Sequence, residues 1–109
     1  MSRAQRPPGD ADNQERPVLL TRGRLVGYAT ERMMFLFTMM HAARIVDCEI
    51  SSNALDDLDG EKGTRPDERE AQFKRLRDTI ERIVSDTFEQ NGRPEGETIR
   101  IFSKHVRSR

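Results

Sequence analysis

Residues with the chemistry of a catalytic or metal-binding site are few in this chain of 109 residues, which contains one Cys and two His. Cys48 falls on the apolar side of an alternating segment, where burial raises the pKa of a thiol, so a core role is favoured over a reactive one. His41 and His105 are far apart in the sequence and have no spacing typical of zinc ligands. No glycine-rich phosphate loop or nucleophile motif is present. We therefore expect no metal and no cofactor.

Carboxylates are more plentiful, and residues 47–70 hold nine acidic against three basic side chains. Asp57, Asp59 and Gly60 resemble part of an EF-hand calcium loop. Aligning Gly60 with the glycine of that loop places Leu55 and Pro66 where oxygen ligands are needed, so calcium binding is not expected. A small enzyme that uses acidic residues near positions 56–61 is kept as a third hypothesis, because acid or base catalysis requires carboxylates in an environment that perturbs their pKa.

Basic residues gather toward the ends of the chain, and residues 91–109 have a net charge of +3. The candidates for weak contacts with phosphates are Arg22, Arg24, Lys104, His105, Arg107 and Arg109. The whole chain has 19 basic and 19 acidic side chains, and no aromatic residues interleave with the basic ones, which favours a solvated tail over nucleic-acid binding. A weak nucleic-acid-binding accessory protein is therefore the second hypothesis.

Length and composition predict one small domain, because 34% of the residues are hydrophobic and 35% are charged. Residues 1–16 contain no aliphatic side chain larger than Ala after Met1, and we expect them to form a disordered tail. Residues 17–106 are predicted to form a single α+β domain, and residues 107–109 a flexible basic C terminus.

The sequence also predicts the cellular compartment. No apolar run approaches the roughly 20 residues that span a bilayer, so we expect no contact with a membrane. The polar first residues do not have the apolar segment of a secretory signal. A single Cys excludes an intramolecular disulfide and favours a reducing compartment, so we expect a cytoplasmic protein.

Short apolar runs with β-branched and aromatic residues predict strands near residues 24–29, 33–40 and 44–50. The last two strands form a hairpin whose turn is residues 41–44, in a register that pairs Met40 with Ile45. In this register one face is entirely apolar and must be core. Its residues are Phe35, Phe37 and Met39 opposite Ile50, Cys48 and Val46.

Two helices and a strand are predicted after the hairpin. Ser or Asn after Ile50 caps a short helix that ends near Gly60. Asp67 opens a long helix with Glu70 as its capping-box partner, and the helix ends at Asn91. A stripe with helical spacing marks its buried side: Phe73, Leu76, Ile80, Ile83, Val84 and Phe88. Residues 98–102 alternate as a final strand.

The predicted fold class is therefore α+β: a small antiparallel sheet of about four strands, packed against one long C-terminal amphipathic helix plus one short helix. A single long helix covers only one face of such a sheet. The second face holds a group of apolar residues, which are Met34, Leu36, Met40, Ile45 and Phe102. Either the remaining strand and helix cover this group, or it is exposed and forms an interface with a partner or with a second copy.

Several of these segments together resemble a family of small bacterial proteins called domain of unknown function 1488. The resemblance rests on the strand with Phe35 and Phe37, on Cys48-Glu49-Ile50-Ser51 with Ala54-Leu55, and on Glu70, Phe73, Arg77, Ile80 and Glu81, and it covers about 70 of the 109 residues. It implies an α+β fold and a bacterial source, and it brings no established activity or site. The first hypothesis is thus a non-enzymatic interaction or accessory module, with an unknown protein or itself as partner in a homodimer.

Overall fold

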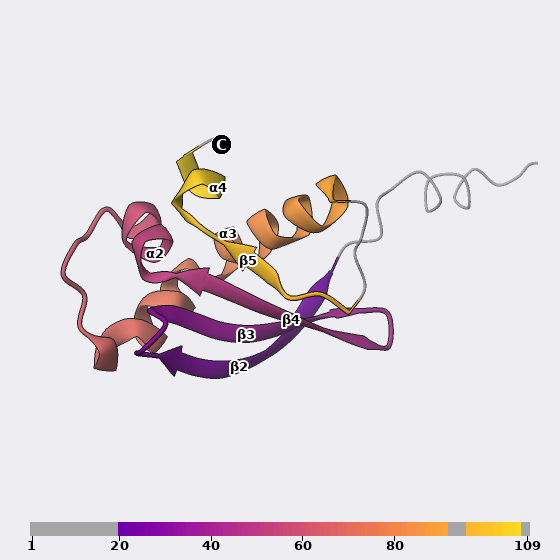
Figure 1. The fold of residues 1–109 in the computed structure, drawn as a ribbon, viewed down its shortest axis with the longest axis horizontal. Helices are drawn as coiled ribbons and strands as arrows, with labels where there is room; N and C mark the ends of the chain where they lie inside the picture. The colour runs from indigo at the N-terminus through magenta and orange to yellow at the C-terminus, as the bar shows by residue number, and fades with distance from the viewer. Residues whose placement is uncertain (1–19, 92–95, 108–109) are drawn as a thin grey trace, which may run out of the picture.

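A computed structural model describes residues 20–91 and 96–107 of the chain (Figure 1). Three long strands come first: β2 (Thr21–Ala29), β3 (Met34–His41) and β4 (Arg44–Ser51). They are followed by the helix α2 (Ser52–Asp59), the 3-10 turn η1 (Pro66–Glu68) and the long helix α3 (Arg69–Gln90). The strand β5 (Ile99–Ile101) and the helix α4 (Ser103–Arg107) end the described chain. The tail predicted at residues 1–16, and residues 108 and 109 of the predicted C terminus, lie outside the described residues.

The strands form one sheet in the order β2-β3-β4-β5. The β3–β4 hairpin is antiparallel and pairs Met40 with Ile45, which confirms the predicted register. The sheet is nevertheless mixed, because β5 runs parallel to β4 and pairs Ile99 with Cys48. The prediction of an entirely antiparallel sheet was wrong in this strand. The connection from β4 to β5 contains a helix of 22 residues, and such a crossover returns the chain to the end of the sheet where β4 began.

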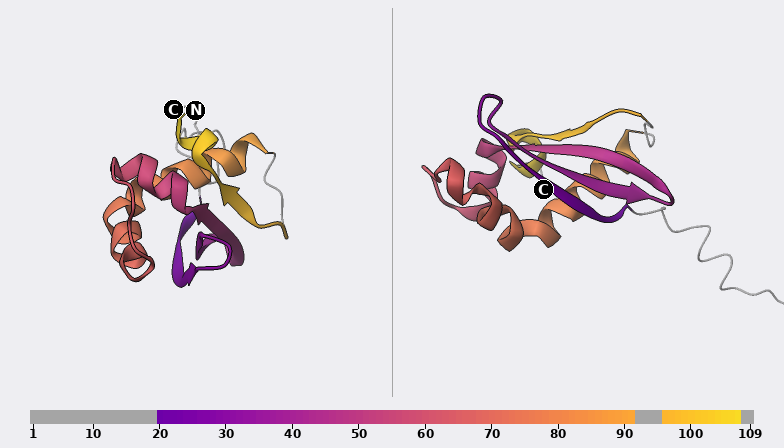
Figure 2. Two further views of the ribbon diagram at one scale, coloured as in Figure 1. Left: turned by 60° about the vertical axis from the view of Figure 1, so that its left-hand side comes forward. Right: turned by 90° about the horizontal axis from the view of Figure 1, so that it is seen from below.

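Helices α2 and α3 lie on one face of the sheet (Figure 2), which we call the inner face. The apolar hairpin face points toward them, and Phe35 stacks on Phe73 of α3 with ring centroids 4.7 Å apart. This confirms both the predicted core face and the α+β class. The buried members of the core include Phe35, Phe37, Met39, Cys48, Ile50, Ala54, Leu55, Phe73, Ile80, Ile83, Val84, Phe88, Ile99 and Ile101.

The helix ends agree only in part with the predicted ones. Ser51 caps α2 by accepting a hydrogen bond from the Ala54 N–H at 3.1 Å, as the sequence predicts. The long helix does not begin with a capping box of Asp67 and Glu70. Instead, Pro66 opens η1, and the Glu68 side chain accepts a hydrogen bond from the Arg65 N–H at 3.3 Å. Proline is well suited to a first helical position and holds the preceding residue extended, so the turn begins earlier.

Helix α4 was not predicted, because five residues are too few to show helical periodicity. It contains three of the basic residues that the sequence places in a solvated tail: Lys104, His105 and Arg107. It packs mainly on α2, beyond the end of the sheet (Figure 1).

Strand β2 is irregular near its start, where the pairing register with β3 shifts between Arg22 and Leu25. Gly23 lies in this shift, and a Cβ atom added there would come within 2.4 Å of the Thr38 carbonyl oxygen. The shifted strand therefore depends on glycine for a close approach between two backbones.

We predict that Gly23→Ala lowers the free energy of unfolding by about 1–3 kcal/mol, because the backbone of β2 or β3 must move to relieve the overlap. In a domain of this size each 1 kcal/mol corresponds to roughly 4–8 °C in the thermal midpoint, which calorimetry or circular dichroism measures directly. Arg24→Ala, at the neighbouring exposed side chain, is the control and is expected to change stability by less than about 0.5 kcal/mol. Equal stability of Gly23→Ala and wild type would contradict this account of β2.

Candidate functional site

The predicted second face of the sheet, which we call the outer face, carries no helix of the described chain and is partly apolar. Ile45 is 69% exposed and Phe102 is 41% exposed, whereas Leu36 and Met40 are half-buried. Met34, the fifth predicted interface residue, is only 6% exposed. Val26 of β2 is 63% exposed, and it lines a shallow hollow of about 270 Å³ together with Leu36. The apolar part of the outer face thus runs from β2 to the start of β4.

A carboxylate lies within this apolar surface. Glu49 is opposite Leu36 in the β3–β4 register, and its side chain is 8% exposed. The Arg32 Nη2 lies 2.5 Å from one carboxylate oxygen, and the Arg100 Nε lies 3.4 Å from the same oxygen. A buried carboxylate needs partners of opposite charge, and here two guanidinium groups supply them. The group of Glu49, Arg32 and Arg100 therefore carries a net positive charge.

The predicted phosphate-binding residues do not form one patch. Arg22 binds Asp78 and Glu81 of α3 through distances of 2.8 and 2.9 Å. Arg107 binds Asp57 at 3.4 Å, at the opposite end of the sheet from Arg22. Lys104 and His105 belong to α4 with Arg107, Arg24 is exposed on β2, and Arg109 lies outside the described residues.

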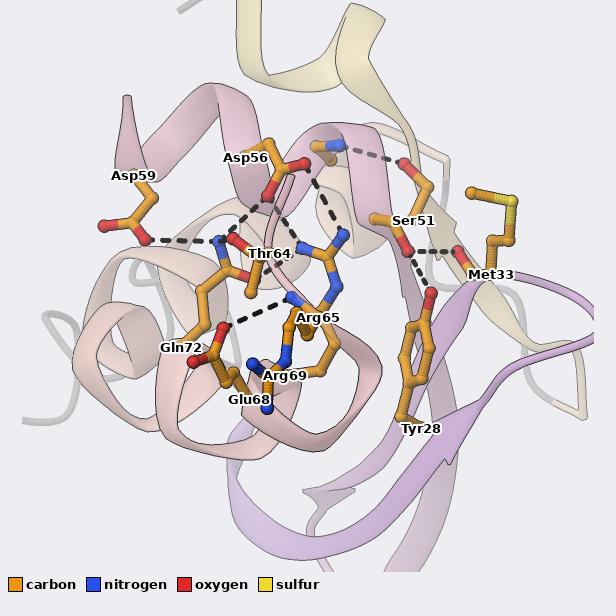
Figure 3. Close-up of polar contacts among 12 residues, drawn as sticks. Tyr28, Met33, Ser51, Asp56, Asp59, Thr64, Arg65, Glu68, Arg69 and Gln72 are labelled. Atoms are coloured by element: carbon orange, nitrogen blue, oxygen red, sulfur yellow. Dashed lines mark hydrogen bonds and ion pairs between the residues drawn. The ribbon is translucent and has the colours of Figure 1, made fainter. Parts of the chain in front are cut away.

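Of the acidic residues near positions 56–61, Asp56 and Asp59 lie in a polar network between α2 and α3 (Figure 3). Arg69 is 5% exposed, and its Nη1 lies 2.7 Å from Asp56 and 2.6 Å from the Gln72 side-chain oxygen. The Gln72 amide nitrogen in turn donates toward Asp56 and Asp59 at 3.0 and 3.1 Å. The Arg75 Nη2 lies 2.7 Å from the same Asp59 oxygen. These carboxylates are satisfied by structural partners.

The electrostatics of Asp56 do not suit a general acid. Burial by itself raises the pKa of this carboxyl, but the hydrogen bonds from Arg69 and Gln72 and the charge of Arg69 outweigh it, so the net pKa is lowered. Asp56 is consequently ionised at neutral pH and stabilises the buried Arg69.

Within residues 20–91 and 96–107, no group of three or more His, Cys, Asp or Glu side chains is placed to hold a metal ion. In the same ranges no helix is long and apolar enough to cross a bilayer.

Cys48 lies in the core beneath α3 and is 1% exposed. Burial, followed by the charge of Asp47, raises the pKa of the thiol to about 12. The predicted core role is confirmed.

Four residues of the outer face and the adjoining β2–β3 turn were not among the site residues predicted from the sequence: Val26, Arg32, Met33 and Glu49. Glu49 could have been found, because the predicted register already placed it opposite Leu36 on the second face. Met33 was assigned to a strand, but it ends the β2–β3 turn with a positive φ of 55°. A bulky residue with this backbone conformation is rare, and no local pattern indicates it.

The fold and the outer face define a small α+β domain. A model of the family described as "Protein of unknown function (DUF1488)" matches residues 23–101. The chain therefore belongs to the DUF1488 family, as the resemblance predicts.

A solved structure has the same fold. It is a crystal structure of a protein of unknown function of the DUF1488 family from Shewanella loihica PV-4. The two chains are 22% identical, the TM-score is 0.62, and the match covers 76% of this chain and 89% of the other. No curated protein matches this chain.

We predict that Asp56→Asn lowers the free energy of unfolding by about 2 kcal/mol at neutral pH, because Arg69 loses its charge partner. The folded pKa of Asp56 lies below the ordinary carboxyl value near 3.9, so its stabilisation is complete above that value and is lost as pH falls through the folded pKa. The difference between wild type and variant should therefore shrink as the pH falls below about 4. Urea unfolding across this range measures it, with Glu61→Gln in the exposed loop as control. A difference in the free energy of unfolding that does not depend on pH would contradict the role of Asp56 as the charge partner of Arg69.

We predict that Cys48 does not react with dithionitrobenzoate in the folded protein. With a pKa of about 12, only about one thiol in ten thousand is ionised near pH 8, and burial also blocks access. The reaction should become rapid in denaturant. Ala43→Cys, at the exposed hairpin turn, is the positive control for labelling of the folded chain. Rapid labelling of folded wild type would show that Cys48 is accessible.

Proposed function

We propose that this protein is a non-enzymatic interaction module that self-associates as a homodimer through the outer face of its sheet. The observation that carries the proposal is the exposure of Val26 and Ile45, at 63% and 69%, on a face that no helix of the described chain covers. Isolated exposed apolar residues are common, but several on one sheet face indicate an interaction surface. Leu36 beside Val26 and Met40 opposite Ile45 are half-buried on β3, with Thr38 between them.

The edges of the sheet are less suited to self-association than its face. On β2, the register shift near Gly23 interrupts the edge, and Arg77 donates a hydrogen bond to the Gly23 carbonyl oxygen at 3.2 Å. Bulges and charged side chains on an edge strand oppose the addition of another strand. The opposite edge strand, β5, contains only three residues.

Charge on the outer face is compatible with a second copy. Asp47 is exposed, while the Arg100 side chain on the neighbouring strand is 51% exposed. A twofold axis places the same surface on both partners, so a face with both signs of charge can pair opposite charges across the contact.

The size of the face indicates a reversible dimer. Strands of eight residues are roughly 27 Å long, and a sheet of four strands is roughly 14 Å wide between its outer strands. The resulting footprint of roughly 400 Å² is about half of the roughly 800 Å² that each partner buries in a standard interface. We therefore expect dissociation on dilution.

The other two hypotheses have weaker support. An enzyme would need an acidic cleft, but Asp56 and Asp59 are held by Arg69, Gln72 and Arg75. Nucleic-acid binding would need a continuous basic surface, but Arg22 and Arg107 lie at opposite ends of the sheet and already have carboxylate partners. We also propose a cytoplasmic location, which the single buried Cys48 supports.

The test is the solution mass by light scattering after size exclusion, measured over a range of concentrations. The mass of wild type should rise from near 12.6 kDa toward twice that value. Ile45→Glu should stay monomeric throughout, with an unchanged circular dichroism spectrum, because its exposed side chain leaves the core intact. Ala71→Glu, on the exposed side of α3, is the matched control and should dimerise as wild type does. A monomeric wild type at millimolar concentration, or a dimer that persists in Ile45→Glu, would refute the proposal.

A further inference from the structure

A groove of about 550 Å³ lies where the β2–β3 turn, the start of α2 and the start of α4 meet. We call it the α2 groove, and its residues of interest are Arg32, Met33, Met34, Phe102, Ser103 and Lys104. Met33 is 55% exposed and Phe102 is 41% exposed, so its apolar walls are open to solvent. The volume is within the range of roughly 300–1,000 Å³ that takes a small ligand or a few peptide residues.

The backbone holds Met33 in a strained conformation at this groove. Its φ is 55°, which costs a non-glycine residue about 1–2 kcal/mol. Two hydrogen bonds from Ser52 to the Met33 carbonyl oxygen maintain it, one from the N–H at 2.9 Å and one from the hydroxyl at 3.0 Å. Tyr28 lies 2.6 Å from the same hydroxyl (Figure 3). An exposed side chain thus occupies a position that glycine would fill at lower cost, which points to a use for the side chain.

The groove is positively charged. Arg32 and Lys104 line it, and none of its lining residues is acidic. Arg32 shares Glu49 with Arg100, so that these three side chains retain a positive charge after pairing. The first turn of α2, which also lines the groove, contains no acidic residue to offset the partial positive charge of the helix N-terminus.

The groove also offers a polar group to a peptide backbone. Asn53 lines it and is exposed, so its amide is open to a ligand. The Ser103 hydroxyl oxygen has no hydrogen-bond partner within the described residues, but it is buried and does not contribute in this conformation. An amide group beside apolar walls suits a peptide better than an alkyl chain, which would leave the amide unsatisfied.

We infer that the α2 groove binds a short acidic peptide segment of a partner protein, with a large apolar side chain against Met33 and Phe102 and a neighbouring carboxylate against Arg32 and Lys104. The inference extends the proposed interaction role to a second surface and does not need the dimer. Ile45, the residue that tests the dimer, is at the hairpin end of the sheet, while the groove is at the α2 end.

The first experiment selects peptides from a random heptapeptide phage library on the full chain, followed by fluorescence anisotropy with the synthetic consensus peptide. We expect a consensus that joins Asp or Glu to Leu, Met or Phe. Selection of peptides without acidic residues, or of no consensus, would overturn the inference.

Two variants test the groove itself. Lys104→Glu reverses an exposed charge and should weaken peptide binding at least tenfold. Met33→Gly removes the apolar side chain and relieves the positive φ, so it should weaken binding at least tenfold while its thermal midpoint equals or exceeds that of wild type. Lys74→Glu, on the exposed side of α3, is the matched control and should bind as wild type does.

Further measurements separate this inference from the dimer and from nucleic-acid binding. Ile45→Glu should bind the peptide with unchanged affinity, whether or not wild type dimerises. Wild-type affinity in Lys104→Glu and Met33→Gly would show that the peptide binds elsewhere. Equally tight binding of a 12-nucleotide single-stranded DNA, lost in Lys104→Glu, would assign the groove to nucleic acid instead.

Discussion

The burial of one guanidinium group, that of Arg69, constrains how the helices meet the sheet. A charged group with 5% exposure needs a partner of opposite charge. The Arg69 Nη1 donates to Asp56 of α2 and Gln72 of α3, and the Tyr28 ring of β2 lies 5.7 Å from the guanidinium carbon, while the buried Nε has no hydrogen-bond partner within the described residues. Arg69 therefore joins three elements that are distant in the sequence, and it fixes the first turns of α3 against α2.

The position of α2 has consequences at the other side of the domain. Because α2 begins directly after β4, its first turn lies beside the β2–β3 turn, and Ser52 can hold the Met33 carbonyl oxygen. Helix α4 packs on α2 and brings Phe102 and Lys104 to the same place. The α2 groove is thus built from three segments that meet at the start of α2, and the polar network around Arg69 positions that helix.

The two faces of the sheet have different roles for a simple physical reason. Within the described residues α3 is the long helix beside the strands, and it lies on the inner face, which takes nearly all of the core. The outer face is then open to solvent, and its central strands carry Leu36, Met40 and Ile45 beside the polar residues Thr38, Asp47 and Glu49. The buried carboxylate of Glu49 is tolerated within that face because Arg32 and Arg100 pair with it, while Val26 and Ile45 stay exposed. This arrangement is consistent with a domain whose function is binding.

The sequence by itself determined the local elements and the core. Alternation in the hairpin, together with its short turn, predicts a register that buries an apolar face, and the stripe from Phe73 to Phe88 has the period of a helix. Tertiary structure alone decided the parallel direction of β5, the separation of Arg22 from Lys104, and the juxtaposition of Met33 with Phe102. These features depend on contacts between residues far apart in the chain, whose energies do not appear in any local pattern.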